Sequence, residues 1–215
     1  MKKTDSDNLE QEGMIPGDLR EESILKNPFE QFKMWFEDAA KSGLEEYNAM
    51  TLATSTKSGH PSARIVLLKG VEDNEFVFYT NYNSRKGSNL KENPYAALVF
   101  FWQPLHRQIR IEGRIKKVSS ARSDRYFHSR PRGSQLGAVL SPQSEVIDNR
   151  DFIDDQLARL NDEFSDAIIP RPKHWGGYAL EPSLIEFWQG RPNRLHDRIV
   201  YRRAGKNWKI ERLAP

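Results

Sequence analysis

The fold is decided by five short stretches rich in β-branched and aromatic residues: AMTLATST (49–56), ARIVLLKGV (63–71), EFVFYTN (75–81), YAALVFFW (95–102) and RQIRIEGRIKKV (107–118). Polar or glycine-containing turns separate them, among them Lys57-Ser58-Gly59-His60 and Glu72-Asp73-Asn74. Short strands at regular spacing are typical of an antiparallel meander or barrel.

The rest of the chain adds helices and a second group of strands. Helices are expected at 84–92, 119–129 and 149–163, and further strands at GYALEPSLIEFWQ (177–189), DRIVYRR (197–203) and NWKIERL (207–213). There is no internal repeat and no low-complexity linker. We therefore predict an α+β fold, an antiparallel β-barrel with peripheral helices packed outside it.

The domain is expected to begin at a helix. Asn27 is a suitable N-cap, Pro28 suits the first helical position, and Gly43 is a suitable stop. Residues 1–26 are polar without periodicity, so we expect a mobile or loosely docked N-terminal segment followed by a single domain over 27–215. The start of the chain has no apolar stretch after its lysines, which argues against a secretory signal.

Composition excludes several classes of protein. The 215 residues contain no cysteine, which rules out disulfides, thiol nucleophiles and Cys-ligated metals, and which fits a cytoplasmic protein. No apolar run is long enough for a membrane span, so no membrane partner is expected. The net charge of +3 is too small to favour nucleic acid. Basic residues, mostly arginines, cluster instead at 85–86, 122–132 and 191–203, which suggests local anion sites.

Common catalytic motifs are absent from the sequence. It contains no G-x-G-x-x-G, no P-loop, no H-E-x-x-H and no G-x-S-x-G, and its five histidines are scattered. We therefore expect no dinucleotide fold, no metal site and no hydrolase triad.

One candidate anion site is the strand-to-helix turn Asn81-Tyr82-Asn83-Ser84-Arg85-Lys86-Gly87. Two cations in a first helical turn oppose the helix dipole unless an anion binds there. A solvated basic turn explains the pattern equally well.

A second candidate surrounds Pro131. Tyr126 and Arg130 share a helix face, and we expect Pro131 to end that helix and to leave Arg130, Arg132 and Ser134 near an irregular segment. Arginine and hydroxyl groups suit a phosphate. From chemistry alone, a helix end decorated with arginines is the simpler explanation.

The third candidate is WQGRPNRLHDR (188–198). If residues 194–198 are extended, Arg194, His196 and Arg198 lie on one face, where three cationic or titratable groups repel one another without an anion. The competing interpretation is a solvated outer face of an edge strand. Lys69, at the end of an apolar strand, is expected at the rim of the sheet, as lysines at strand ends commonly are.

Taken together and in order, these stretches resemble the pyridoxine/pyridoxamine 5'-phosphate oxidase family. The resemblance rests on RIVLLK, YTNYNSRK, RQIRIEG, YFHSRPRGSQ, SPQS, IEFWQG, RLHDR and the final WKIERLAP, and covers roughly residues 27–215. It implies an FMN-binding split barrel, a homodimer with FMN sites at the interface, and oxidation of pyridoxine 5'-phosphate and pyridoxamine 5'-phosphate by O2 to pyridoxal 5'-phosphate and H2O2.

The resemblance also implies site residues. FMN would be bound by Arg64, Ile65, Val66, Leu67, Leu68, Lys69, Tyr79, Thr80, Arg85, Lys86, Gln108, Gln143, Ser144, Trp188 and Arg198. The substrate would be bound by Lys69, Tyr126, Arg130, Ser134, Arg194, Leu195 and His196. Arg194 and His196 are the candidates for positioning the reacting carbon and assisting proton movement.

The sequence departs from the family at its start. Members commonly carry an Arg and a Tyr ahead of the first helix, whereas here no arginine precedes Arg20 and no tyrosine precedes Tyr47. We therefore expect no N-terminal site residue. Two alternatives stay open: a split-barrel flavin or haem binder without B6 oxidase activity, and a nucleic-acid-binding barrel.

Overall fold

An antiparallel sheet forms the centre of the computed structural model, which describes residues 18–215. Its strands are β1 (Ala49–Ser55), β2 (Pro61–Leu67), β3 (Gly70–Glu72), β4 (Glu75–Asn81), β5 (Tyr95–Trp102), β6 (Arg107–Lys117), β7 (Trp175–Gln189), β8 (Asp197–Ala204) and β9 (Asn207–Arg212). The helices are α1 (Pro28–Lys41), α2 (Arg85–Glu92), α3 (Ser120–Ser129), α4 (Arg132–Leu140) and α5 (Asp151–Phe164), with 3-10 turns η2 (Gln103–Leu105) and η3 (Pro192–Arg194). The predicted α+β class is confirmed.

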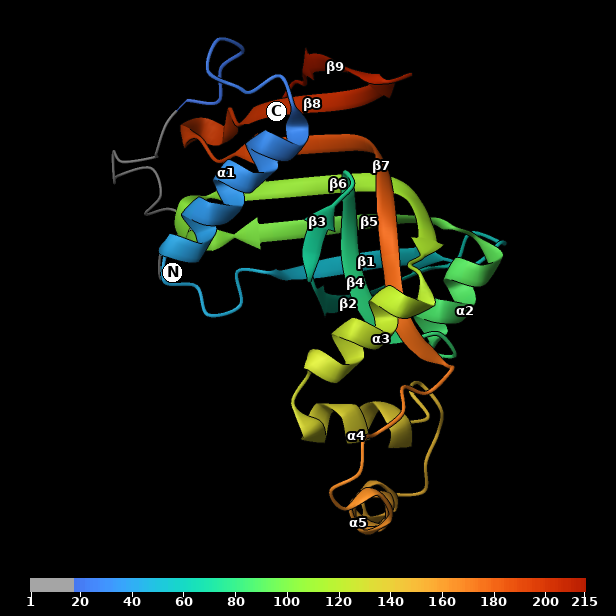
Figure 1. The fold of residues 1–215 in the computed structure, drawn as a ribbon. Coiled ribbons are helices and arrows are strands. Elements are labelled where there is room, and N and C mark those ends of the chain that lie inside the picture. Colours follow the sequence, from blue (N-terminus) through green and yellow to red (C-terminus); the bar gives the residue numbers. More distant parts are fainter. Residues whose placement is uncertain (1–17) are drawn as a thin grey trace, which may run out of the picture.

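The long strand β7 connects two parts of the sheet. The strand order is β2-β1-β5-β6-β7-β4-β3, with β8 and β9 added beside β7. The first residues of β7 pair with β4 and its last residues pair with β8, while β6 pairs along most of its length. The register shifts at Gly113, where a Cβ would lie 2.1 Å from the carbonyl oxygen of Glu181. This irregularity accompanies the bend of β7 in Figure 1 and lets one strand serve both parts.

Helix α1 covers one side of the sheet, as Figure 1 shows. It begins as predicted, because the Asn27 side chain accepts a hydrogen bond from the Phe29 N–H, and Gly43 follows its end with φ +83°. Phe32 packs edge-on against Phe76 and Phe100, at 4.9 and 5.4 Å between ring centroids. The main hydrophobic core therefore lies between α1 and the strands.

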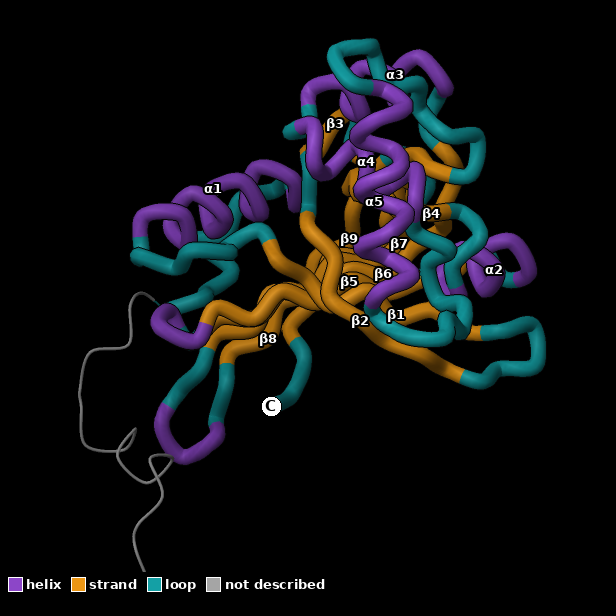
Figure 2. Tube along the Cα trace, turned by 90° about the horizontal axis from the view of Figure 1, so that it is seen from below, coloured by secondary structure: helices purple, strands orange, loops and turns teal. Residues whose placement is uncertain are grey.

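A second, smaller core joins α3, α4 and α5 to the start of β7. Phe127, Leu136, Leu160 and Trp175 are its large buried members. Figure 2 shows these three helices grouped together, with α1 on the other side of the sheet. This group of helices carries three of the predicted site residues, Tyr126, Arg130 and Ser134.

Helix α4 corrects the sequence-based expectation of an irregular segment after Pro131. Pro131 does follow the end of α3, but it also stands at the N-cap position of α4, so Ser134 is helical. The sequence of α4 contains Gly133 and Gly137 and has low intrinsic helix propensity. Burial of Leu136 in the second core supplies the stabilisation that local sequence lacks.

Of the segment expected to be mobile or loosely docked, residues 18–26 are docked on the domain. Leu19 is buried, the Tyr201 hydroxyl donates to the Leu25 carbonyl at 2.7 Å, and Arg212 donates to the Leu19 carbonyl at 2.7 Å. The segment therefore packs against β8 and β9. The remainder of the expected mobile segment, residues 1–17, lies outside the described residues.

Candidate active site

The strand-to-helix turn after β4 begins helix α2 as the sequence predicts. Ser84 is the N-cap, and its hydroxyl accepts from the Gly87 N–H. Gly87 is required by a close approach, because a Cβ there would lie 2.0 Å from the Tyr82 carbonyl oxygen. Arg85 and Lys86 consequently occupy the first turn, where the helix dipole favours an anion.

Three cations gather at this turn. Among residues 18–215, no carboxylate lies within 4.0 Å of the Arg64, Arg85 or Lys86 side chain. Burial, and to a smaller extent the charge of Arg64, lower the pKa of Lys86 from 10.5 to about 8. Burial and the charge of Arg85 also lower the pKa of Arg64. Unpaired, partly desolvated cations at a helix N-terminus fit a phosphate group.

Gln143 links this cluster to β4. Its Oε1 accepts from the Lys86 ammonium at 2.7 Å and from the Thr80 hydroxyl at 3.2 Å. Ser144, the next residue, is exposed and has φ +77°. Thr80, Lys86 and Gln143, which the family resemblance assigned to one ligand, thus lie together.

The RIVLLK stretch presents alternate residues to opposite sides of β2. Arg64, Val66 and Leu68 face inward, whereas Ile65 is 62% exposed on the outer side. The strand ends at Leu67. Lys69 then lies exposed between β2 and β3, with its backbone N–H bonded to the Val77 carbonyl.

A second cluster forms where α3 meets β4 and β7. The rings of Tyr79 and Tyr126 stack with centroids 3.8 Å apart, and Trp175 lies parallel to both. The Arg130 guanidinium lies 4.6 Å from the centroid of the Trp175 ring. Its Nη1 is buried and has no hydrogen-bond partner among the described residues. Ser134 stands nearby in sequence, in the first turn of α4.

A third group lies at the other end of β7. The sheet register places Gln108 opposite Trp188 and Trp188 opposite Arg198, so the three form a row across β6, β7 and β8. The buried Glu186 carboxylate accepts from Arg198 Nε at 2.8 Å and approaches Arg110 at 2.7 Å. Arg198 is therefore fixed by a carboxylate, in contrast to the first cluster.

The expectation of an extended segment over 194–198 is wrong. Asn193 and Arg194 have φ of +57° and +59° in the turn η3, which closes through a hydrogen bond from the Leu195 N–H to the Pro192 carbonyl. Strand alternation starts only at Asp197. Arg194, His196 and Arg198 therefore do not share a strand face.

His196 nevertheless joins the third group. Its ring lies 4.6 Å from the Trp188 ring, and its Nδ1 is 3.1 Å from the Arg191 backbone nitrogen, which donates to it. Burial and the charge of Arg194 lower its pKa. Arg194 and Leu195 are exposed beside it.

The second cluster and the third group lie at opposite ends of β7. Tyr79 pairs with Gly177 near the start of β7, whereas Gln108 and Arg198 pair with Trp188 near its end. The strand between Gly177 and Trp188 has a contour of roughly 36 Å, at ~3.3 Å per residue. Figure 1 shows β7 running from the side of α2 and α3 toward β8.

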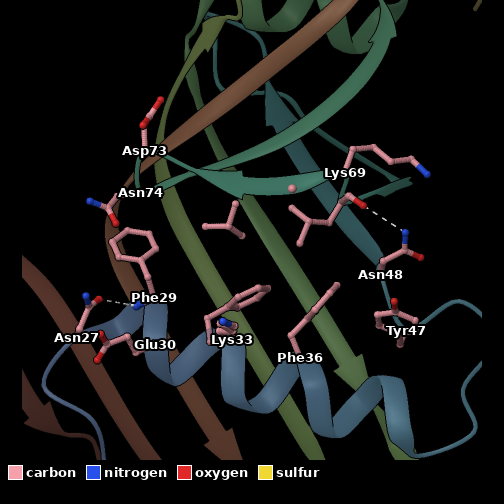
Figure 3. Close-up of a pocket in the computed structure, with 14 residues that line it drawn as sticks. Asn27, Phe29, Glu30, Lys33, Phe36, Tyr47, Asn48, Lys69, Asp73 and Asn74 are labelled. Atoms are coloured by element: carbon pink, nitrogen blue, oxygen red, sulfur yellow. Dashed lines mark hydrogen bonds between the residues drawn. The ribbon is translucent and has the colours of Figure 1, made fainter. Parts of the chain in front are cut away.

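A cavity of about 740 Å³ lies apart from these clusters, between α1 and the segment that joins β2 to β4. Figure 3 shows its aromatic wall, which includes Phe29, Phe36 and Tyr47. Of the predicted site residues only Leu68 and Lys69 line it, and the Lys69 ammonium extends away from the aromatic rings. We do not assign the active site to this cavity.

Sequence reasoning missed several residues that contact the predicted site. Trp175 lies under Arg130, Asn89 and Thr54 belong to a network around Arg64, and Arg191 contacts His196. Asn89 could have been noticed, because it lies four residues after Arg85 on one helix. The other contacts join residues that are distant in sequence or oriented by a turn, so periodicity carries no signal for them. No helix among residues 18–215 is both long and apolar enough to cross a membrane.

Two features define the class of protein as a split-barrel protein. They are the bent antiparallel sheet and the N-terminus of α2, where cations suit the binding of a phosphate. An FMN-binding protein of Nostoc punctiforme, described as related to pyridoxamine 5'-phosphate oxidase, shares this fold with a TM-score of 0.70 and 18% identity, covering 89% of this chain and 100% of that one. The family model "Pyridoxamine 5'-phosphate oxidase" matches residues 36–163, and "Pyridoxine 5'-phosphate oxidase C-terminal dimerisation region" matches residues 175–215. The chain belongs to the pyridoxamine 5'-phosphate oxidase family, as its resemblance indicated.

Similar proteins cover nearly the whole chain. A pyridoxine/pyridoxamine 5'-phosphate oxidase of Salinibacter ruber is 55% identical over 201 residues, covering 92% of this chain and 94% of the relative. Another relative is the chloroplastic pyridoxine/pyridoxamine 5'-phosphate oxidase 1 of Arabidopsis thaliana. It is 51% identical over 206 residues, covering 94% of this chain and 39% of that protein. The structure of PhzG from Burkholderia lata, in complex with tetrahydrophenazine-1-carboxylic acid, has a TM-score of 0.88 at 29% identity and covers 94% of this chain and 100% of that one.

Proposed function

We propose that the protein is an FMN-dependent pyridoxine/pyridoxamine 5'-phosphate oxidase that forms pyridoxal 5'-phosphate. Family membership and identity above 50% to enzymes of that name over more than nine-tenths of the chain support this activity. FMN, when bound, supplies the acceptor for two electrons and passes them to O2, which yields H2O2. The chain's own residues bind and orient the two phosphorylated molecules.

The first cluster is assigned to the FMN phosphate. The observation that carries this assignment is the gathering of Arg64, Arg85 and Lys86 without a carboxylate partner in the described part of the chain. A phosphate dianion would compensate their mutual repulsion and the burial of Lys86. Gln143 Oε1 accepts from the Lys86 ammonium and holds its position, and the Thr80 hydroxyl donates to the same oxygen.

The second cluster is assigned to the substrate phosphate. Among residues 18–215, the buried Nη1 of Arg130 has no hydrogen-bond partner, and a buried guanidinium N–H is costly unless an acceptor binds it. Tyr126 and Ser134 offer hydroxyl groups from the same pair of helices, and Lys69 adds an exposed ammonium from the β2–β3 connection. A protein that only binds flavin would not need this cluster.

The third group is proposed to complete the site from a second copy of the chain. Trp188 and Arg198 pair near the end of β7, whereas Tyr79 pairs with Gly177 near its start, so the two sets of predicted FMN residues lie at opposite ends of this strand. The match of residues 175–215 to a dimerisation region supports a homodimer in which these ends meet. FMN would then lie at the interface between the two subunits.

Arg194 and His196 are proposed to hold the reacting carbon of the substrate. Because Nδ1 of His196 accepts from the Arg191 N–H, a neutral His196 carries its proton on Nε2 and can donate it there. The exposed Arg194 guanidinium is free of carboxylate partners among residues 18–215 and can contact an anionic substrate. Both would position C4' of the substrate and assist proton movement.

The test is a paired assay on one preparation. Flavin content is measured after denaturation. H2O2 and pyridoxal 5'-phosphate are measured with pyridoxine 5'-phosphate and with pyridoxamine 5'-phosphate, and unphosphorylated pyridoxine is the control. We expect one FMN per chain and activity only with the phosphorylated substrates. A yellow protein that produces no peroxide from either phosphate ester would support the alternative, a split-barrel flavin binder without B6 oxidase activity. A colourless protein that fails to bind added FMN would contradict the cofactor assignment.

A further inference from the structure

The guanidinium of Arg64 belongs to a closed ring of hydrogen bonds that also includes Thr54, Asn89 and Ser62. Arg64 Nη1 donates to the Thr54 hydroxyl at 2.8 Å, and Nη2 donates to the Ser62 hydroxyl at 2.7 Å. On the far side of both hydroxyls, Asn89 Nδ2 donates to Thr54 at 3.1 Å and to Ser62 at 3.0 Å. One amide group of α2 is thus connected to the guanidinium through two hydroxyls.

Asn89 donates to both hydroxyls of this ring. Each hydroxyl oxygen has two lone pairs, and here each accepts once from Arg64 and once from Asn89. The two hydroxyl oxygens are themselves 3.3 Å apart, and either hydroxyl can donate to the other. Thr54 and Asn89 are 3% and 4% exposed, so water cannot readily replace either contact.

The ring opposes the tendency of Arg64 to leave the cluster. Arg64 lies in the same charged neighbourhood as Arg85 and Lys86, and repulsion among like charges favours movement of a long side chain into solvent. Cross-strand pairing of Thr54 with Ser62 and of Leu52 with Arg64 fixes three members of the ring on adjacent strands. Helix α2, which supplies Arg85 and Lys86, also supplies Asn89.

We propose that Asn89, acting through Thr54 and Ser62, is a positioning residue that holds Arg64 against the phosphate of the flavin cofactor. The inference rests on the proposed function, in which Arg64, Arg85 and Lys86 bind that phosphate. Helix α2 thereby sets all three cations at once: two as its own residues and the third through the ring.

The experiment compares FMN with riboflavin, which has the same ring system but no phosphate. Full-length protein is equilibrated by dialysis with each flavin, and both dissociation constants are measured for the parent chain and for Asn89→Leu. We expect Asn89→Leu to weaken FMN binding about tenfold, equivalent to ~1.4 kcal/mol, and to change riboflavin binding less than about threefold. A merely structural role would weaken both flavins equally, and that result, or an unchanged FMN constant, would overturn the proposal.

Asn93→Leu is the matched control. Asn93 lies at the end of the same helix, and its Nδ2 donates to the hydroxyl of Ser55 on β1 at 2.8 Å without contacting Arg64. Both variants lose an amide–hydroxyl contact between α2 and β1, so only Asn89→Leu should lower the preference for FMN over riboflavin.

A second variant keeps the test decisive if Asn89→Leu does not fold. Ser62→Ala removes one acceptor of Arg64 from a half-buried strand position and should lower the FMN preference about threefold to tenfold. An unchanged preference would overturn the proposal. Failure of the proposed function is a distinct result: the parent chain would then bind riboflavin as tightly as FMN.

Discussion

Replacement of Lys86 by methionine should stabilise the flavin-free protein and weaken its binding of FMN. Lys86 is a buried ammonium, 9% exposed, that donates to Gln143 at 2.7 Å and approaches the Ser84 hydroxyl at 3.3 Å. Methionine has a similar length and no charge, so Lys86→Met removes the desolvation cost while it approximately preserves the volume.

The magnitude follows from the pKa of Lys86. In the folded chain this pKa is about 8 instead of 10.5, a difference that corresponds to roughly 3 kcal/mol favouring the neutral amine. Below pH 8 the amine is charged in both folded and unfolded chains, and the full cost opposes folding. Loss of the hydrogen bond to Gln143 costs ~1 kcal/mol, so the expected net gain at pH 7 is about 2 kcal/mol.

The lowered pKa of Lys86 determines how the stability difference between Lys86→Met and the parent changes with pH. Between pH 8 and 10.5 the unfolded chain binds more protons at this position than the folded chain does, so the stability of the parent rises with pH. The advantage of Lys86→Met should therefore shrink through that window and disappear above it. Denaturant unfolding at fixed protein concentration, at pH 7 and at pH 10, measures the difference.

FMN binding should respond in the opposite direction. A hydrogen bond from a charged group contributes ~1.5–3 kcal/mol, so Lys86→Met should raise the FMN dissociation constant by roughly ten- to a hundredfold at pH 7. In the parent chain, affinity should fall above pH 8 as the ammonium loses its proton, and the variant should lack this fall. A variant that is less stable than the parent at pH 7 and that binds FMN normally would refute the reasoning.

The other predictions concern the remaining site groups. Arg85→Ala should weaken FMN binding roughly ten- to a hundredfold in equilibrium dialysis and leave the KM of the FMN-saturated enzyme unchanged; an unaltered FMN constant would make Arg85 a solvated surface residue. Arg194→Ala and His196→Ala should both retain flavin and the dimer yet lower kcat/KM by up to ~100-fold in the peroxide assay, Arg194→Ala more strongly; loss of flavin in both would assign them to the cofactor. Deletion of residues 1–17, which spares the contact of Asp18 with Arg191, should keep the flavin content and cost less than about a hundredfold in kcat/KM; a larger loss would show that the segment forms part of the site.

Features with a local cause could be predicted from the sequence. The start of α1 depends on Asn27 and Pro28, and the start of α2 depends on Ser84. Both signals act between residues that are neighbours in the chain. The strands followed from short runs of β-branched and aromatic residues at regular spacing, and the ordered motifs indicated the family, which the comparisons confirm.

Other features depended on contacts between distant residues. Helix α4 has weak propensity and forms because Leu136 is buried in a core made by three helices and the start of β7. The turn at Arg194 could not be distinguished from a strand by alternation, because its conformation follows from a left-handed Asn193 and a hydrogen bond to Pro192.

The site itself divides in the same way. The sequence alone determined that cations, hydroxyls and aromatic residues of the required kinds are present, because their identity is a property of single positions. Only the tertiary structure decided that Asn89 meets Arg64 through two hydroxyls, and that Trp188 lies at the opposite end of β7 from Tyr79. Those relations are set by sheet register and strand length, which arise when the strands pair and which no local pattern encodes.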